Sequence, residues 1–599
     1  MEPAPVARPV SRGAHSASAV PALAIVLVLA LLWLSLYPAS ASNAAHPASV
    51  IDVGPGDDLQ AAIDQAQPGD TIRLVAGATY AGMFTLPSKA AGNPVLIRTN
   101  APDADLPPAG TRVRPEHVPL LAKVTAGSGS VFSAAPGAHD FHFLGLEISP
   151  TPGTFLYNVI TLGDGTEPLA QQPRDIVFER CYIHGDPIAG SRRGIALNGR
   201  GISVLDSRLS DFKEVGADSQ ALAGWSGAGP FTIVNNYLEG AAENVMFGGA
   251  DPSVTGLVPA DIVVRHNHFF KPLSWKTDDP SYAGTHWSVK NLFELKNARR
   301  VLVEGNVFEQ NWADAQSGFS ILFTVRNQDG SAPWSQVDHV VFQDNILRHG
   351  GAGFNLLGYD NNFPSQQTGN VTIRNNLVTD VSDTWGGNGA FLQMLDGTSD
   401  VVVDHNTVLH TGNVITGDGR PHSGFVFTNN IAPHNLYGVI GTNHGPGNDS
   451  LDVYFPSREF RRNAIPGASP TAYPVDNFYP AALGDVGFID LAGGNYRLAD
   501  SSAYKGAGTD GTGIGADIPA VEMATCGAVN GTYCTVPNPG GDGLPFGSLG
   551  GVPVILILAV VAAVGVAIAL LAWRRRRSGP PSQSGAGKGL SPAAPSSRR

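Results

Sequence analysis

Two charged side chains in the middle of the chain stand where acid–base chemistry could occur. In the segment NLFELKNA, residues 291–298, apolar and polar residues alternate. Alternation with a period of two is typical of a β-strand, and it predicts that Phe293 and Leu295 point inward while Glu294 and Lys296 point outward. The later segment TVRN places Arg326 at the position equivalent to Lys296. We therefore expect Lys296 and Arg326 to lie close together on one surface.

In the third segment, LGYD, Tyr359 occupies the same position and completes a predicted row of Lys296, Arg326 and Tyr359. Glu294 lies beside this row and is a substrate-binding candidate. A neighbouring positive charge lowers the pKa of a lysine and makes it a better base, whereas arginine stays protonated. Such a group suits β-elimination on a uronic-acid polymer. That reaction needs a base for the proton next to the carboxylate, a cation for the developing anion and a donor for the leaving oxygen.

The alternative is that these side chains form a solvated surface. Long charged side chains on an exposed strand are usually hydrated, and Glu294 and Lys296 could simply pair with each other. The sequence leaves both interpretations open.

Tryptophans in the same region suggest contact with sugars. Trp275, Trp287 and Trp312 lie in or near segments that connect the predicted strands, and flat rings beside the row could bind substrate by stacking on sugar faces. Large aromatic rings also pack irregular segments against a scaffold, so loop packing is the alternative. The long polar insertion at residues 271–287 is of the kind that often carries function.

A repeated asparagine organises the elements that must position these residues. A pattern of alternating apolar and polar residues followed by Asn returns at spacings of 24 to 39 residues. Side-chain amides both donate and accept, so stacked copies can bond to each other along a solenoid. We interpret these residues as a structural ladder, not a functional site: Asn236, Asn267, Asn306, Asn345, Asn376, Asn406 and Asn430.

Each repeat contains short strands that cannot bury an apolar face alone. Stacking equivalent strands ~4.8 Å apart produces parallel sheets around one interior, so we predict an all-β parallel β-helix. A propeller needs about four strands in ~40 to 45 residues, and leucine-rich repeats need another leucine spacing. Neither pattern occurs in this sequence.

Both ends of such a stack need covers. Residues 59–66 form an amphipathic helix candidate followed by a strand at residues 71–74. Together with the closing segments at residues 485–490, 495–498 and 513–517, this resembles the secreted right-handed β-helix proteins of the pectin-lyase-like superfamily. The resemblance covers about residues 50–520 and implies a right-handed solenoid with a short N-terminal cap helix.

Lys296 and Arg326 carry a weaker resemblance, to alginate lyases and chondroitinase B-like polysaccharide lyases. Those enzymes use a Lys and an Arg from different coils, usually with Ca²⁺. The sequence itself requires no cofactor, but the resemblance implies a calcium site. Its candidate metal ligands, chosen by position only, are Glu243, Asn244 and Asp251. Paired arginines typical of pectate lyases and stacked aspartates typical of polygalacturonases are not recognisable.

Composition limits the partners. The chain has 599 residues, and Gly (72) and Pro (45) are abundant, which favours turns and short strands. Residues 43–550 hold 29 basic against 50 acidic residues. An acidic body argues against non-specific nucleic-acid binding.

Two apolar segments predict the cellular location. Residues 20–36 follow Arg8 and Arg12 and precede Ala39-Ser40-Ala41, as in a secretory signal peptide that we place at residues 1–42; an uncleaved anchor is the alternative. Residues 552–573 form a predicted transmembrane helix, with a buried core helix as the alternative. The arginines at 574–577 predict that residues 574–599 are a cytoplasmic tail and that residues 43–520 face outward. Residues 521–551 are a predicted Pro/Gly-rich linker.

Cysteines and histidines add little chemistry. Cys526 and Cys534 could form a disulfide, and Cys181 is expected to be a buried apolar residue. The histidine spacings match no zinc pattern.

The sequence thus leaves two functions open. One is a single-pass surface protein that binds an extracellular polysaccharide and cleaves it by β-elimination. The other is a non-catalytic glycan-binding or adhesive protein with the same fold.

Overall fold

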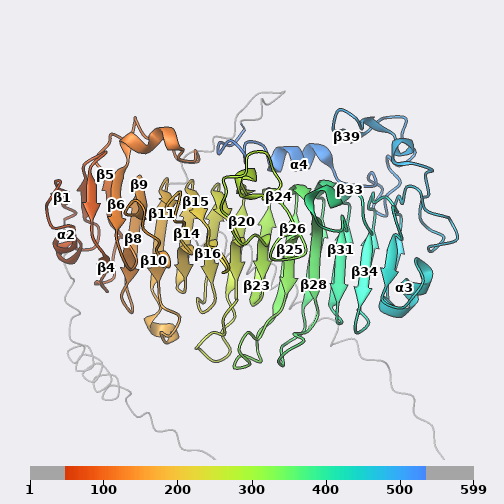
Figure 1. Cartoon of the computed structure of the whole chain (residues 1–599), viewed down its shortest axis with the longest axis horizontal. Coiled ribbons are helices and arrows are strands. Elements are labelled where there is room, and N and C mark those ends of the chain that lie inside the picture. Colours follow the sequence, from red (N-terminus) through yellow and green to blue (C-terminus); the bar gives the residue numbers. More distant parts are fainter. Residues whose placement is uncertain (1–46, 535–599) are drawn as a thin grey trace, which may run out of the picture. The chain divides into compact units, whose positions relative to one another are not determined.

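Three long parallel sheets wind around a common interior in the computed structural model, which describes residues 47–534 (Figure 1). Successive strands along the chain belong to sheets B, C and A in turn, so three strands make one coil. The predicted parallel β-helix is therefore the observed architecture.

Sheet A has fourteen strands: β1 (Val50–Val53), β2 (Thr71–Leu74), β5 (Val95–Thr99), β8 (His139–Leu144), β11 (Arg174–Glu179), β14 (Arg200–Leu205), β17 (Phe231–Val234), β20 (Ala260–Arg265), β23 (Ala298–Glu304), β26 (Val337–Gln343), β29 (Gly369–Arg374), β32 (Ser399–Asp404), β35 (Val426–Thr428) and β37 (Glu459–Arg461).

Sheet B has eleven strands: β3 (Thr79–Ala81), β6 (Ala122–Ala126), β9 (Leu146–Pro150), β12 (Tyr182–His184), β15 (Arg208–Phe212), β18 (Tyr237–Gly240), β21 (His268–Phe270), β24 (Val307–Asn311), β27 (Ile346–Gly350), β30 (Leu377–Val381) and β33 (Thr407–His410).

Sheet C has twelve strands: β4 (Phe84–Leu86), β7 (Phe132–Ala134), β10 (Asn158–Leu162), β13 (Arg193–Leu197), β16 (Gln220–Gly224), β19 (Glu243–Phe247), β22 (Asn291–Leu295), β25 (Phe319–Thr324), β28 (Ala352–Leu357), β31 (Leu392–Leu395), β34 (Ile415–Asp418) and β36 (Val439–Gly441).

Alternation in the sequence places one face of each strand in the interior. In β23, Val301 and Val303 are buried while Leu302 and Glu304 are partly exposed. Inward rings of neighbouring coils stack on each other, as in the pair Phe269 and Phe308, whose centroids are 4.3 Å apart. Such pairs add to the burial of apolar area in one continuous core.

The asparagine ladder lies at the tight turn between sheets A and B. The backbone N–H and Nδ2 of Asn267 both donate to Oδ1 of Asn306, at 2.9 and 3.0 Å, and the same pair of bonds recurs from Asn236 to Asn477. Asn463 and Asn477 extend the ladder beyond the predicted members. Ser207 and Cys181 continue the position at the other end. Every member is buried, so each bond forms away from water.

From Cys181 to Asn463, each residue at the ladder position follows a residue with positive φ, which turns the chain within two residues. These positions are mostly polar or glycine: Arg180, Asp206, Asn235, His266, Gly305, Asp344, Asn375, His405, Asn429 and Arg462. Asn, Asp and Gly tolerate this left-handed conformation best, which explains why the sequence pattern is strongest at this turn.

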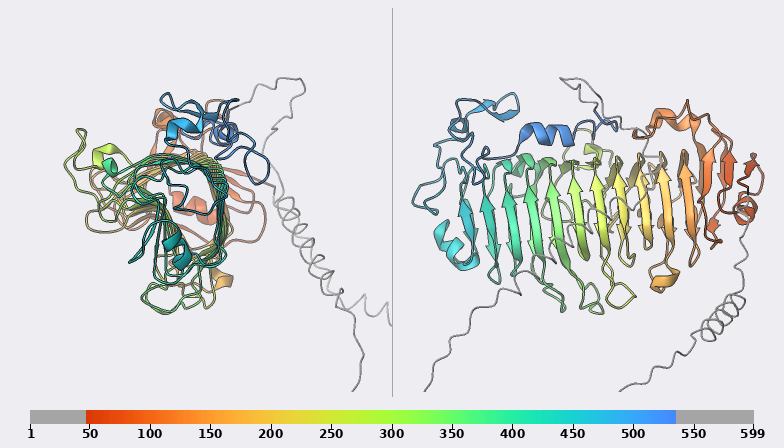
Figure 2. Two further views of the ribbon diagram at one scale, coloured as in Figure 1. Left: turned by 90° about the vertical axis from the view of Figure 1, so that its right-hand side faces the viewer. Right: turned by 180° about the vertical axis from the view of Figure 1, so that it is seen from behind.

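Short helices cover both ends of the tube. Helix α2 (Leu59–Gln65) lies across the N-terminal end of the bore and buries Leu59, Ala62 and Ile63, as predicted (Figure 2). Helix α3 (Asn448–Tyr454) lies at the other end and buries Leu451 and Tyr454 in the same core (Figure 1). The sequence did not predict α3.

Other short elements lie outside the sheets. The predicted closing segment forms an antiparallel hairpin of β38 (Phe488–Asp490) and β39 (Asn495–Leu498). Helix α4 (Ile518–Ala524) follows it, and short 3₁₀ helices occur at η1 (Pro115–Leu120), η2 (Leu169–Gln171), η3 (Leu273–Trp275), η4 (Asp383–Trp385) and η5 (Leu483–Val486).

Residues 508–533, here called the strap, run back over the turns that carry the ladder (Figure 1). Ala516 and Asp517 donate backbone N–H groups to Thr407 Oγ1 and Asn375 Oδ1 at 2.9 and 2.6 Å. Ile518 and Val521 of α4 pack on Leu377. The predicted linker at residues 521–551 therefore begins with a packed segment.

The far end of the strap reaches early coils. His266 Nε2 lies 2.8 Å from the carbonyl of Cys526, and buried Arg112 donates to the carbonyl of Ala528 at 2.8 Å. Cys526 and Cys534 are both disulfide-bonded, whereas Cys181 is free and buried.

Several predictions from the sequence concern segments that the structure does not describe. Between residues 47 and 534, no helix is long and apolar enough to cross a membrane. The signal peptide at residues 1–42 and the transmembrane helix at residues 552–573 lie outside this range and stay predictions.

Candidate functional site

Lys296 and Arg326 lie on adjacent coils, at the corner where sheet C leads into sheet A. Lys296 follows the last residue of β22, and the backbone N–H of Arg326 donates to its carbonyl at 2.8 Å. Phe293 and Leu295 are fully buried, so the inward and outward faces of β22 are as predicted. The Lys296 and Arg326 side chains are 15% and 29% exposed, so both are partly open to solvent.

The register differs from the predicted one by two residues at this point. Leu295 pairs with Phe323 and not with Val325. The strand β25 ends at Thr324, and the chain then bends so that Arg326 still meets Lys296. Alternation along each strand could not reveal this irregularity, because a shift of two residues preserves which side chains face inward.

Carboxylates surround Lys296 and reverse the expected shift of its pKa. Burial of the ammonium lowers the pKa, and Arg326 lowers it further, but Glu294, Glu243 and Asp218 together outweigh them and raise it. Glu294 Oε1 is 3.6 Å from Lys296 Nζ. Arg326 thus acts in the predicted direction, but the carboxylates outweigh it, so the pKa of Lys296 is raised and the side chain is held in its charged form.

Glu243, which belongs to the same cluster, has a strongly raised pKa. Its side chain is fully buried, and burial together with the charges of Glu294 and Asp218 raises its pKa to about 7. Gln220 Nε2 donates to its Oε2 at 2.7 Å. Its Oε1 takes part in no hydrogen bond among the described residues and lies 3.9 Å from Lys290 Nζ.

A row of polar side chains leads to Glu243 along sheet C. Register pairs Arg193 with Gln220, Gln220 with Glu243, and Glu243 with Asn291. Asn291 Nδ2 in turn donates to Glu294 Oε2 at 3.0 Å. The sequence pattern did not predict this row, although each member is the first residue of a strand of sheet C, so an alignment of the strand starts brings the four residues together.

Arg326 is fixed by the following coil. Its Nη1 donates to Asp360 Oδ1 at 2.9 Å, and the Asp360 side chain is only 1% exposed. A charge-assisted bond to a buried carboxylate orients the guanidinium firmly.

Tyr359 contacts Arg420, which follows β34. The Arg420 guanidinium carbon lies 4.7 Å from its ring centroid, and both residues line a cavity of about 340 Å³ beside Asp360. Its role as a proton donor stays a prediction.

The three tryptophans predicted to bind sugar are buried together. Trp275, Trp287 and Trp312 are 3%, 7% and 4% exposed and form a cluster of their own with Ala241 and Val289. Lys213 Nζ lies 5.3 to 5.4 Å from the centroids of the first two rings. These rings hold the loop at residues 271–290 against the coils, so the predicted substrate stacking does not fit their position.

The predicted calcium ligands do not converge. Asn244 Oδ1 accepts a hydrogen bond from Lys271 Nζ at 3.0 Å. Asp251 Oδ2 accepts from the backbone N–H groups of Asp329 and Ser331 and caps that loop. Calcium takes six to eight oxygen ligands, so these three residues do not fit it. Within residues 47–534 there is no group of three or more His, Cys, Asp or Glu side chains that could hold a metal ion.

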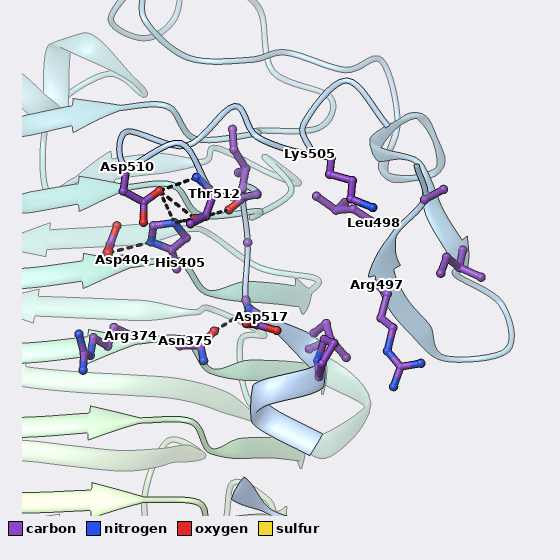
Figure 3. A pocket seen from close by; sticks show the side chains of 18 of the residues that line it. Arg374, Asn375, Asp404, His405, Arg497, Leu498, Lys505, Asp510, Thr512 and Asp517 are labelled. Carbon is purple, nitrogen blue, oxygen red and sulfur yellow. Dashed lines mark hydrogen bonds and ion pairs between the residues drawn. The ribbon is translucent and has the colours of Figure 1, made fainter. Parts of the chain in front are cut away.

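A larger cavity of about 910 Å³ lies elsewhere, between the strap, the hairpin β38–β39 and the ladder turns (Figure 3). Charged groups on its wall are ion-paired: His405 Nδ1 lies 2.8 Å from Asp404 Oδ2, Lys505 pairs with Asp500, and Arg497 pairs with Glu522 of α4. The same histidine contacts Thr512 of the strap at 3.0 Å. The contacts of Arg497 with Glu522 and of His405 with Thr512 hold the strap in place, and we locate the candidate site on sheet C.

Comparison with known proteins gives structural neighbours only. No family model and no curated protein matches the chain. A mannuronic acid specific polysaccharide family 6 lyase from human gut microbiota shares 14% identity over 71% of this chain and 87% of its own, with a TM-score of 0.47. The PL6 family alginate lyase AlyGC shares 13% identity over 78% of this chain and 58% of its own, with a TM-score of 0.46.

Another structural neighbour is an adhesin. The Streptococcus pneumoniae surface protein and adhesin PfbA shares 12% identity over 72% of this chain and 97% of its own, with a TM-score of 0.34. At such identities the likeness concerns the fold, so function has to be argued from the residues on sheet C.

Proposed function

We propose that the protein binds an acidic, uronate-containing polysaccharide at the outer surface of a cell, on the corner of sheet C that carries Lys296 and Arg326. The observation that carries this proposal is their placement: two partly exposed cations on adjacent coils, joined by a backbone hydrogen bond. Both side chains are oriented by carboxylates, and cations fixed in this way suit the carboxylate groups that recur along a polyuronate.

Cleavage by β-elimination is the second candidate, favoured by the contact between Lys296 and Arg326 on adjacent coils, which places a lysine beside a fixed cation. In this reaction a neutral Lys296 Nζ takes the proton next to the uronate carboxylate, the electron pair forms a carbon–carbon double bond, and the glycosidic C–O bond breaks. The leaving oxygen then takes a proton, for which Tyr359 is the predicted donor. Lys296 must first lose its own proton, a step that the neighbouring carboxylates oppose because they raise its pKa.

Binding and near-ultraviolet absorbance of the full-length protein separate these functions. Polymannuronate, polygalacturonate and chondroitin sulfate serve as probes, since elimination creates an absorbing double bond and binding does not. Binding of at least one polymer supports the proposal, and new absorbance that Lys296→Ala removes adds cleavage. Lys505→Ala is the matched control, because it removes an exposed lysine near the strap. Binding of none of the three polymers by the parent protein contradicts the proposal.

A further inference from the structure

A second cluster of cationic and aromatic side chains lies on the same sheet, nearer the N-terminus. Tyr157 immediately precedes β10 and is 53% exposed. The Arg192 guanidinium carbon lies 4.3 Å from its ring centroid, and Arg192 Nη1 donates to the Tyr157 hydroxyl at 2.7 Å. The Arg193 guanidinium carbon is 5.3 Å from the same ring and 5.2 Å from the ring of Trp225.

Hydrogen bonds with Glu214 and Gln220 hold the two arginines of this cluster in place. Glu214 binds Arg192 through two bonds of 2.5 and 2.7 Å, and Gln220 Oε1 accepts from Arg193 Nε at 2.9 Å. Burial raises the pKa of the Tyr157 hydroxyl, but Arg193 and Arg192 outweigh it and lower the pKa. Glu214 pairs with Arg192, so Arg193 is the cation of this cluster that remains for a carboxylate.

Register connects this cluster to the central site. Arg193 pairs with Gln220, and the row continues through Glu243 to Asn291 at the start of the strand that leads to Lys296. Three strand spacings of ~4.8 Å put Arg193 and Asn291 about 14 Å apart along the tube. One extended polymer lying along sheet C could contact both places.

We propose that Tyr157, Arg192, Arg193 and Trp225 form a second contact for the same acidic polysaccharide, in which the exposed Tyr157 ring stacks on a sugar and Arg193 binds a carboxylate. This inference rests on the proposed function of Lys296 and Arg326. It extends that function, because it makes recognition depend on the length of the polymer.

The test compares long and short probes on full-length variants. Tyr157→Ala and Arg193→Gln are measured for equilibrium binding of polymannuronate, polygalacturonate and chondroitin sulfate, and of the disaccharide of each. The matched control is Tyr437→Ala, since Tyr437 is 54% exposed but precedes β36 at the opposite end of sheet C. Thermal unfolding of each variant checks that the coils remain folded. Tyr157→Ala removes only an exposed ring, so it still tests the inference if Arg193→Gln does not fold.

Both variants are expected to weaken binding of the preferred polymer by roughly 5- to 10-fold, as for loss of a desolvated aromatic–cation contact, and to leave disaccharide binding unchanged. The inference is overturned if Lys296→Ala weakens polymer binding while Tyr157→Ala and Arg193→Gln do not, a result that leaves the proposed function intact. It is also overturned if Tyr437→Ala has the same effect as Tyr157→Ala. Binding of no polymer by the parent protein contradicts both proposals.

Discussion

Charge pairing at single residues decides what the corner of sheet C can do. Glu294, Glu243 and Asp218 keep Lys296 protonated, and Asp360 fixes Arg326, so both groups enter a complex as cations. A protonated lysine binds a carboxylate well but abstracts no proton. The residues therefore support binding directly, whereas cleavage requires that Lys296 first lose its proton.

Glu243 should make binding depend on pH. Its pKa of about 7 means that it gains a proton as the pH falls from 8 to 6, which removes one negative charge beside Lys296. Uronate carboxylates, with pKa values near ~3.5, stay ionised over this range. We expect the affinity for the preferred polyuronate to rise about 3- to 5-fold from pH 8 to pH 6, and Glu243→Gln to abolish the rise. An unchanged pH profile in Glu243→Gln would exclude Glu243 as its source.

The same group links pH to stability. Because the folded pKa of Glu243 is raised above its ordinary value of 4.5, its contribution to stability is fully present below pH 4.5 and is lost as the pH rises through about 7. Glu243→Gln should therefore raise the unfolding temperature relative to the parent more at pH 8 than at pH 5.

Among the elements, the ladder and the strap hold the coils in register. Asn306 Oδ1 accepts two bonds from Asn267, and its Nδ2 donates to Asn345 and to the carbonyl of Val264. Each ladder asparagine thus binds two coils through buried bonds, which makes the ladder a cooperative element.

Loss of one inner ladder residue should destabilise the fold strongly. Asn306→Ala leaves the N–H of Asn267 buried without an acceptor, at a cost of about 2–4 kcal/mol in the free energy of unfolding. Asn477→Ala is the control, since Asn477 is the last ladder residue and bonds to a ladder asparagine on one side only. Denaturant unfolding followed by tryptophan fluorescence should give a smaller loss for Asn477→Ala, and equal losses would contradict the cooperative role.

The strap should come free when its apolar contact is broken. Val521 is fully buried in α4 whereas Met523 on the same helix is 62% exposed. Val521→Asp places a charge in the apolar contact with Leu377, at a cost of about 2–4 kcal/mol, and should expose residues 508–533 to limited proteolysis. Met523→Asp should leave the cleavage pattern unchanged. Protection of the strap in Val521→Asp would show that the other contacts suffice.

At the scale of the whole molecule, the sequence predicted the tube better than its surface. The ladder asparagines and the inward Phe293 and Leu295 follow from repetition and alternation, which depend on local chemistry. Burial of Trp275, the irregular end of β25 and the pKa of Lys296 depend on contacts between separate coils. The strap has no repeat, so nothing in the sequence indicated where it packs. Local sequence patterns therefore predicted the coils, whereas the chemistry of the site depends on contacts between coils that these patterns do not contain.

The central claim is that polyuronates bind the corner of sheet C, and a matched pair of double variants tests it most directly. Lys296→Ala/Arg326→Ala removes two cations from this corner. Arg265→Ala/Arg300→Ala removes two from β20 and β23 on sheet A in the same part of the tube, where the side chains are 48% and 47% exposed. We predict that the sheet C variant of the full-length protein loses at least about 10-fold in affinity for the preferred polymer, and the sheet A variant less than about 2-fold. Equal losses in the two variants, or no loss in the sheet C variant, would contradict the account.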